Sequence, residues 1–232
     1  MTLIKLQDLE KQAKYTALFD ELNAKKAELV ALDDELKMLE SKQAKNAATI
    51  NAVRNEFETE IGKIKAKFDE DSELTLDDYA DMQKLKAELK ARVDFFTATG
   101  EELERKIYDK REAVYRVKNV FLSVRKDLYR FTALALIDEF IEANRDKITL
   151  FKGMFVYSGE YDAYTGRDGH DEFNDVLIKK FNVEMNPALP PETALPPLTL
   201  ADGWKPKTPT QLHAEAFKAQ KETGFKRLLN DI

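Results

Sequence analysis

Proline is absent from the first 186 residues of this 232-residue chain. All seven prolines lie at or after Pro187, and only Gly62 and Gly100 precede Gly153. Proline breaks helix interiors, and glycine costs about 1 kcal/mol there relative to alanine. The sequence therefore favours helix over the first two thirds of the chain, with Gly62 and Gly100 as the two places where a helix could break.

Apolar residues recur at sevenfold spacing through the first part of this region. One seam of the repeat is formed by Leu22, Leu29, Leu36, Ile50, Phe57 and Ile64, and the other by Leu18, Leu32, Leu39 and Val53. Gln43, Lys25 and Asn46 are the polar members of the two seams. An a/d heptad pattern of this kind predicts that the helix supercoils against another helix.

The heptad pattern stops at the acidic stretch 69–78, DEDSELTLDD. Thr75 is a favourable N-cap for a second helix, and Asp77 and Asp78 complement the positive end of its dipole. The periodic positions of that helix are Met82, Leu85, Leu89, Phe96, Leu103, Ile107, Val114, Val117, Phe121, Val124, Leu128, Phe131 and Ala135. A turn near 69–76 would therefore fold two helices, each on the order of 100 Å long, into an antiparallel coiled-coil hairpin.

A compact helical region is expected to follow over 129–185. Residues 129–141 are apolar on more than one face, which predicts burial on several faces. We expect a helix or a short strand over 150–157, a loop over 159–169, and a short amphipathic helix over 172–181.

Six of the seven prolines lie in residues 186–207, which predicts an extended linker with no periodic face, anchored by Trp204. The segment 208–232 then begins as a helix, because Thr-Pro-Thr-Gln at 208–211 is a T-x-x-Q capping box with proline at the first helical position. So short a helix is marginal alone in water, so it is expected to dock on its own chain, a second copy or a partner. The side chains expected at that interface are Gln211, Leu212, Ala216, Phe217, Lys218, Phe225, Leu228 and Leu229.

These patterns predict an all-α protein with four parts. A long antiparallel coiled-coil hairpin occupies 1–128 and a compact helical region 129–185. A proline-rich linker over 186–207 leads to a C-terminal docking helix over 208–232.

Composition and motifs argue against several classes of function. The chain has no cysteine, a net charge of −6 and no dense basic face, so neither thiol chemistry nor direct nucleic-acid binding is expected. No apolar run reaches the length of a membrane helix. His170 lies in an acidic surface loop at 168–172 that matches no zinc or calcium-loop spacing. The pairs Asp33-Asp34 and Asp77-Asp78 are expected on solvated helix faces. With no phosphate-loop, G-x-S-x-G or H-E-x-x-H motif, we expect no enzyme activity, cofactor or metal.

The stretch 207–220, KTPTQLHAEAFKAQ, resembles a T-P-x-Q…K-x-Q pattern of the polarity suppression (Psu) family of satellite bacteriophages. Thr208-Pro209, Gln211, Lys218 and Gln220 carry the likeness. Residues 76–111 and 125–141 resemble the charged hairpin helix and the following apolar helix of that family. The first helix is longer here, and the proline linker is more elaborate.

The resemblance implies an all-helical, intertwined, V-shaped homodimer that decorates the outside of a phage capsid. It also implies inhibition of the host transcription terminator Rho as a second activity. The partners would be a second copy, the capsid protein and Rho, and the locations the host cytoplasm and the capsid surface of the virion. Two alternatives stay open: a coiled-coil external scaffold or capsid-assembly factor, and an adaptor that binds a host protein through its terminal helix.

Overall fold

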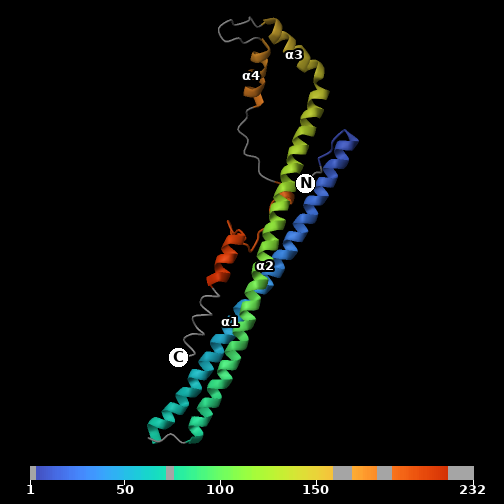
Figure 1. Cartoon of the computed structure of the whole chain (residues 1–232). Coiled ribbons are helices and arrows are strands. Elements are labelled where there is room, and N and C mark those ends of the chain that lie inside the picture. The colour runs from blue at the N-terminus through green and yellow to red at the C-terminus, as the bar shows by residue number, and fades with distance from the viewer. Residues whose placement is uncertain (1–3, 72–75, 159–168, 182–189, 219–232) are drawn as a thin grey trace, which may run out of the picture. The chain divides into compact units, whose positions relative to one another are not determined.

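The computed structural model describes residues 4–71, 76–158, 169–181 and 190–218 (Figure 1). Over these residues the chain is helical and holds no strand. Its helices are α1 (Leu9–Asp71), α2 (Leu76–Ala143), α3 (Arg145–Ser158) and α4 (Gly169–Phe181), followed by a 3-10 turn at Pro191–Thr193. Residues 209–218 form a further helix. The predicted all-α fold is confirmed.

The two long helices form the predicted hairpin, because α1 and α2 run antiparallel and pack closely (Figure 1). Neither helix breaks at its glycine: α1 continues through Gly62 and α2 through Gly100. Favourable side chains on both sides of each glycine therefore outweigh its cost of about 1 kcal/mol.

The starts of both helices follow from local sequence. The carboxylate of Asp8 accepts hydrogen bonds from two backbone N–H groups of the first turn of α1, at 2.9 and 3.1 Å, and so caps the helix. Asp77 and Asp78 lie in the first turn of α2, where they complement the helix dipole as predicted. The predicted cap Thr75 lies outside the described residues.

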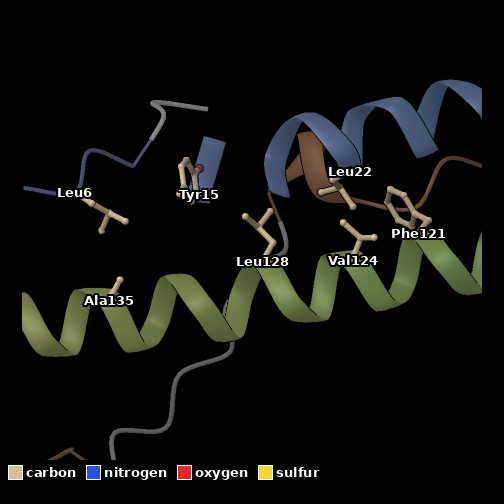
Figure 2. Packing of buried hydrophobic residues seen from close by; sticks show 7 residues of the cluster. All are labelled: Leu6, Tyr15, Leu22, Phe121, Val124, Leu128 and Ala135. Carbon is tan, nitrogen blue, oxygen red and sulfur yellow. The ribbon is translucent and has the colours of Figure 1, made fainter. Parts of the chain in front are cut away.

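The chain divides into two compact units, and α1 and α2 contribute to both. The first unit consists of Met1–Lys26 and Val120–Pro196. Its core lies where side chains of α1 face side chains of α2 (Figure 2). The buried members of this core are Leu6, Tyr15, Leu22, Phe121, Val124, Leu128 and Ala135. Four of them, from Phe121 to Ala135, occupy the periodic positions predicted for the second helix.

The second unit consists of Ala27–Asn119 and Pro197–Ile232. Its core is the heptad seam, whose buried members are Leu29, Leu36, Val53, Ile107 and Val114. The polar seam residue Asn46 donates a hydrogen bond from Nδ2 to the backbone oxygen of Phe96 at 2.9 Å. Beside the seam, Arg111 pairs with Glu40 at 2.7 Å. The predicted coiled-coil contact is therefore present in this unit.

The prediction that residues 129–141 are buried on several faces is wrong. Ala135 is buried against α1, but Leu134, Ile137 and Ile141 are about half exposed. The reason is geometric: α1 covers one face of α2 here, and the described residues of α3 and α4 leave an open apolar groove beside another face. The open choice over 150–157 resolves to helix, since α3 spans these residues.

The short helix α4 was predicted over 172–181 and begins earlier, at Gly169. A side chain at Gly169 would collide with the backbone of Phe155 in α3, so only glycine permits this close approach. The ring of Phe173 then packs 5.9 Å from the ring of Phe155. His170 therefore lies in a helical turn and not in a loop. Residues 159–168 of the predicted loop lie outside the described part of the chain.

The proline-rich segment makes side-chain and backbone contacts in addition to the predicted anchor at Trp204. We call residues 190–207 the strap. In the first unit, the fully buried Thr193 bonds through its hydroxyl to that of Tyr129, and Leu195 packs against the core. Lys26 donates to two backbone carbonyl oxygens of the strap, at 3.3 and 3.0 Å. A proline-rich segment has few backbone N–H donors of its own, so side chains of a neighbouring helix can bind its carbonyl groups.

Candidate functional site

One buried carboxylate attaches the strap to α1 in the second unit. Asp33 is 2% exposed and accepts two hydrogen bonds from Thr199, from the backbone N–H at 2.7 Å and the hydroxyl at 3.0 Å. Lys37 pairs with the same carboxylate at 2.9 Å. Burial alone would raise the pKa of Asp33, but the hydrogen bonds from Lys37 and Thr199 outweigh it and hold the pKa below its ordinary value of 3.8. The expectation of a solvated face holds for Asp34 and is wrong for Asp33.

A turn and an aromatic cluster hold the next part of the strap. The N–H of Trp204 bonds to the carbonyl of Ala201 at 3.1 Å, and Gly203 within this turn has a φ of 82°, which favours glycine. The turn places the Trp204 ring edge-on to Tyr108 and Tyr115, at 6.0 and 5.9 Å. The prediction that Trp204 anchors this segment is confirmed.

Lys207 joins the strap to both α2 and the terminal helix. Its backbone N–H donates to the Tyr108 hydroxyl at 2.8 Å. Its ammonium group lies 5.7 Å from the centre of the Tyr108 ring and pairs with Glu215 at 2.6 Å. One residue therefore fixes the point at which the helix leaves the strap.

The predicted capping box at 208–211 is present. The N–H of Thr208 donates to Oε1 of Gln211 at 2.9 Å, and the N–H of Gln211 donates to the Thr208 hydroxyl at 3.3 Å. Pro209 is the first helical residue, as predicted. This reciprocal pair satisfies two backbone donors at the helix start.

Every described residue of this helix, 209–218, is exposed. Leu212 and Phe217 are 46% and 62% exposed. The structure thus brings five of the predicted interface residues together on one exposed helix: Gln211, Leu212, Ala216, Phe217 and Lys218. Phe225, Leu228 and Leu229 lie outside the described residues.

A cleft of about 810 Å³ lies beside the start of this helix. Trp204, Tyr108 and Leu212 contribute its apolar surface. Its charged lining is mixed, with acids Glu40, Glu101, Glu104 and Asp109 and bases Arg105, Arg111, Lys205 and Lys207. The lining therefore combines aromatic and apolar side chains with charges of both signs.

The sequence offered no signal for the partnership of Asp33 with Thr199 or of Tyr108 with Lys207, because neither pair is close in the chain. In the described residues, no three His, Asp or Glu side chains are grouped to hold a metal ion. Nor does any helix in that part of the chain carry an apolar stretch long enough to cross a bilayer. Comparisons with protein-family models, curated proteins and solved structures found no match.

Proposed function

We propose that this protein decorates a phage or satellite-phage capsid as a homodimer, with the terminal helix as its contact surface. The observation that carries the proposal is the exposed, capped helix at 209–218, held to α2 through Lys207 and Trp204. The resemblance to the polarity suppression family is carried by Thr208, Pro209, Gln211 and Lys218 at this helix and by Gln220. Inhibition of the host terminator Rho is the second activity within this proposal, and the host cytoplasm and the virion surface are its locations.

The physical support is preorganisation. A helix that is already formed and held in place loses less conformational entropy when it binds than a flexible tail does. Leu212 and Phe217 offer large apolar side chains to a partner, and exposed apolar side chains of a helix commonly insert into a groove of the partner. A symmetric homodimer would present two such helices to a repeating capsid lattice.

A second candidate is a scaffold or adaptor, acting as an external capsid-assembly factor or as a binder of a host protein. It is favoured by a separate exposed apolar surface in the first unit, which includes Ile137, Ile141 and Phe151. A scaffold would bind unassembled capsid protein, and an adaptor would bind one host protein without affinity for capsids.

Co-sedimentation of the purified protein with assembled capsids tests the proposal. We expect saturable binding, which Leu212→Glu and Phe217→Glu should weaken at least tenfold. Ala214→Glu is the matched control for Leu212→Glu, because it adds the same charge two residues along the same exposed helix, on nearly the opposite side from Leu212. Wild-type protein that ignores capsids, or equal loss in the control, would contradict the proposal.

The dimer is tested separately by light scattering. If the terminal helix stabilises the homodimer, deletion of residues 207–232 should lower the molar mass in solution toward that of one chain. If the deletion leaves the molar mass of the dimer unchanged, this helix does not form the subunit interface.

A further inference from the structure

An apolar groove lies in the first unit, where three helices meet. The chain bends between the end of α2 at Ala143 and the start of α3 at Arg145, and α4 packs against α3 (Figure 1). The groove has a volume of about 690 Å³, which is in the range of small-molecule sites. Its apolar lining includes Leu136, Ile137, Phe140, Ile141, Phe151 and Leu177.

The apolar lining of the groove is only partly covered by the described chain. The six side chains just named are each 36–53% exposed. Contiguous exposed apolar surface of this kind is characteristic of a binding site. A ligand with a hydrocarbon part gains affinity here, because binding removes apolar surface of both the ligand and the groove from water.

The polar side chains of the lining are few and carry charge of one sign. They are Asn144 and Lys147, and no Asp or Glu belongs to the described lining. The amide of Asn144 is held by a hydrogen bond that its Nδ2 donates to the carbonyl oxygen of Phe140 at 2.9 Å. No acidic side chain in the described part of the chain pairs with Lys147. The groove therefore combines apolar walls with one ammonium group that has no carboxylate partner there.

Shape and charge favour a small anionic ligand over a second copy of the chain. A two-fold dimer brings the same surface of both copies together, and two grooves placed face to face would leave unfilled space with no packing contacts. A hydrocarbon chain is convex and can fill a groove. A negative head group is attracted by Lys147, whereas a positive one is repelled.

We propose that this groove binds a long-chain carboxylate, that is, a fatty acid. The hydrocarbon chain lies against the apolar walls that α2, α3 and α4 contribute, and the carboxylate pairs with Lys147. The groove belongs to the first unit and the helix at 209–218 to the second, so this binding does not rest on the proposed capsid contact.

Isothermal titration calorimetry of the full-length chain with monomeric dodecanoate tests the proposal. We expect saturable binding, which should be about tenfold weaker for decanoate because two fewer methylene groups are buried. Dodecanol has the same chain without the charge and should bind about fivefold more weakly than dodecanoate. Absence of dodecanoate binding, or equal affinity for dodecanoate and decanoate, would overturn the proposal.

A substitution that fills the groove tests the location. Ile137→Trp places a larger side chain in the groove and should weaken dodecanoate binding at least tenfold. Because Ile137 is 53% exposed, the fold should tolerate the change, which circular dichroism checks. Leu134→Trp is the matched control, since Leu134 is equally exposed on the same helix and is not a lining residue. Equal loss of binding in both variants would place the ligand elsewhere and overturn the proposal.

The role of the charge is tested at α3. Lys147→Ala should weaken dodecanoate binding about fivefold and leave dodecanol binding unchanged. The control Lys152→Ala makes the same change on the same helix outside the lining and should leave the affinity for dodecanoate unchanged. Equal affinities of the wild type for dodecanoate and dodecanol would contradict a carboxylate site.

Two other occupants give distinct results, and each would overturn the proposal. If a second copy covers the groove, Ile137→Trp should lower the molar mass in light scattering, and the wild type should not bind dodecanoate. If the groove instead docks on a membrane, the protein should sediment with anionic phospholipid vesicles but should not bind monomeric dodecanoate.

Discussion

Thr199 and Asp33 lie 166 residues apart in the sequence and are joined by two hydrogen bonds, at 2.7 and 3.0 Å. The carboxylate that accepts them is 2% exposed. This contact fixes the strap to α1 in the second unit, ahead of the aromatic cluster and the terminal helix.

Asp33→Asn should destabilise the attachment of the strap. The change removes the charge that Lys37 neutralises and turns one acceptor into a donor facing Thr199. We expect the free energy of unfolding to fall by about 2 kcal/mol, as for a lost hydrogen bond to a charged group. Urea denaturation measures this, and the emission of Trp204, the single tryptophan, reports on the strap. In the control Asp34→Asn the side chain is 64% exposed, and its effect should stay below about 0.5 kcal/mol.

Acid should weaken the same contact. A carboxyl group with a lowered pKa in the folded state contributes stability that is fully present above its unfolded pKa of about 3.9. That stability is lost as the pH falls through the still lower folded pKa. The difference in unfolding free energy between wild type and Asp33→Asn should therefore be constant from about pH 7 to 5 and shrink below about pH 4. If the difference in unfolding free energy between wild type and Asp33→Asn does not change in strong acid, either Asp33 stays charged there or its charge contributes nothing to stability.

Trp204→Ala should loosen the strap without unfolding the hairpin. It removes two edge-on ring contacts, with Tyr108 and Tyr115, each worth about 0.5–1.5 kcal/mol beyond area burial. Amide hydrogen exchange of residues 199–212 should accelerate about tenfold, the equivalent of roughly 1.4 kcal/mol. Trp204→Phe keeps an aromatic ring and should retain most of the protection, so equal acceleration in both variants would argue against ring packing.

The heptad seam should be intolerant of charge. Leu36 is fully buried, so Leu36→Asp should cost more than about 3 kcal/mol by placing an unpaired carboxylate among apolar side chains. Met38, two residues further along the same helix, is 60% exposed, and Met38→Asp should cost about 0.5 kcal/mol. Thermal unfolding by circular dichroism compares the two, and similar midpoints would mean that Leu36 does not pack as described.

The two helix glycines should respond differently to alanine. At Gly62 a new Cβ would meet no atom within 4 Å, so Gly62→Ala should raise the unfolding free energy by about 1 kcal/mol. At Gly100 the new Cβ would lie 3.0 Å from Nδ2 of Asn46, which is bonded to Phe96. That crowding should cancel the gain at Gly100. Equal stabilisation of both variants in urea denaturation would show that Asn46 can move aside.

The hairpin could be predicted because its signal is local and repeated. Leu22, Leu29 and Leu36 recur at a spacing that only a helix places on one face, and each is fully buried. The capping box at 208–211 was predictable for the same reason, since its partners are three residues apart.

The strap could not be predicted, because its contacts join residues with no shared period. Nothing near Asp33 distinguishes it from the exposed Asp34, and its partner Thr199 is remote in sequence. The burial of 129–141 was predicted wrongly for a related reason. Apolar composition indicates that a surface can be buried in a contact, but it does not identify the contacting partner. Five of the predicted interface residues lie on one described helix, and their role in binding remains a prediction.

The long sequence separation of Asp33 and Thr199 also sets an order of events during synthesis. The hairpin helices leave the ribosome well before the strap, so the seam can pack while the strap is still being made. The strap then packs onto the folded hairpin and so closes a very long loop. The entropic cost of closing a loop is large and grows slowly with loop length. Chains that stop before Thr199 would retain the hairpin sequence but lack the strap that holds the terminal helix. Display of that helix therefore requires the strap, which packs only after the hairpin helices have been made.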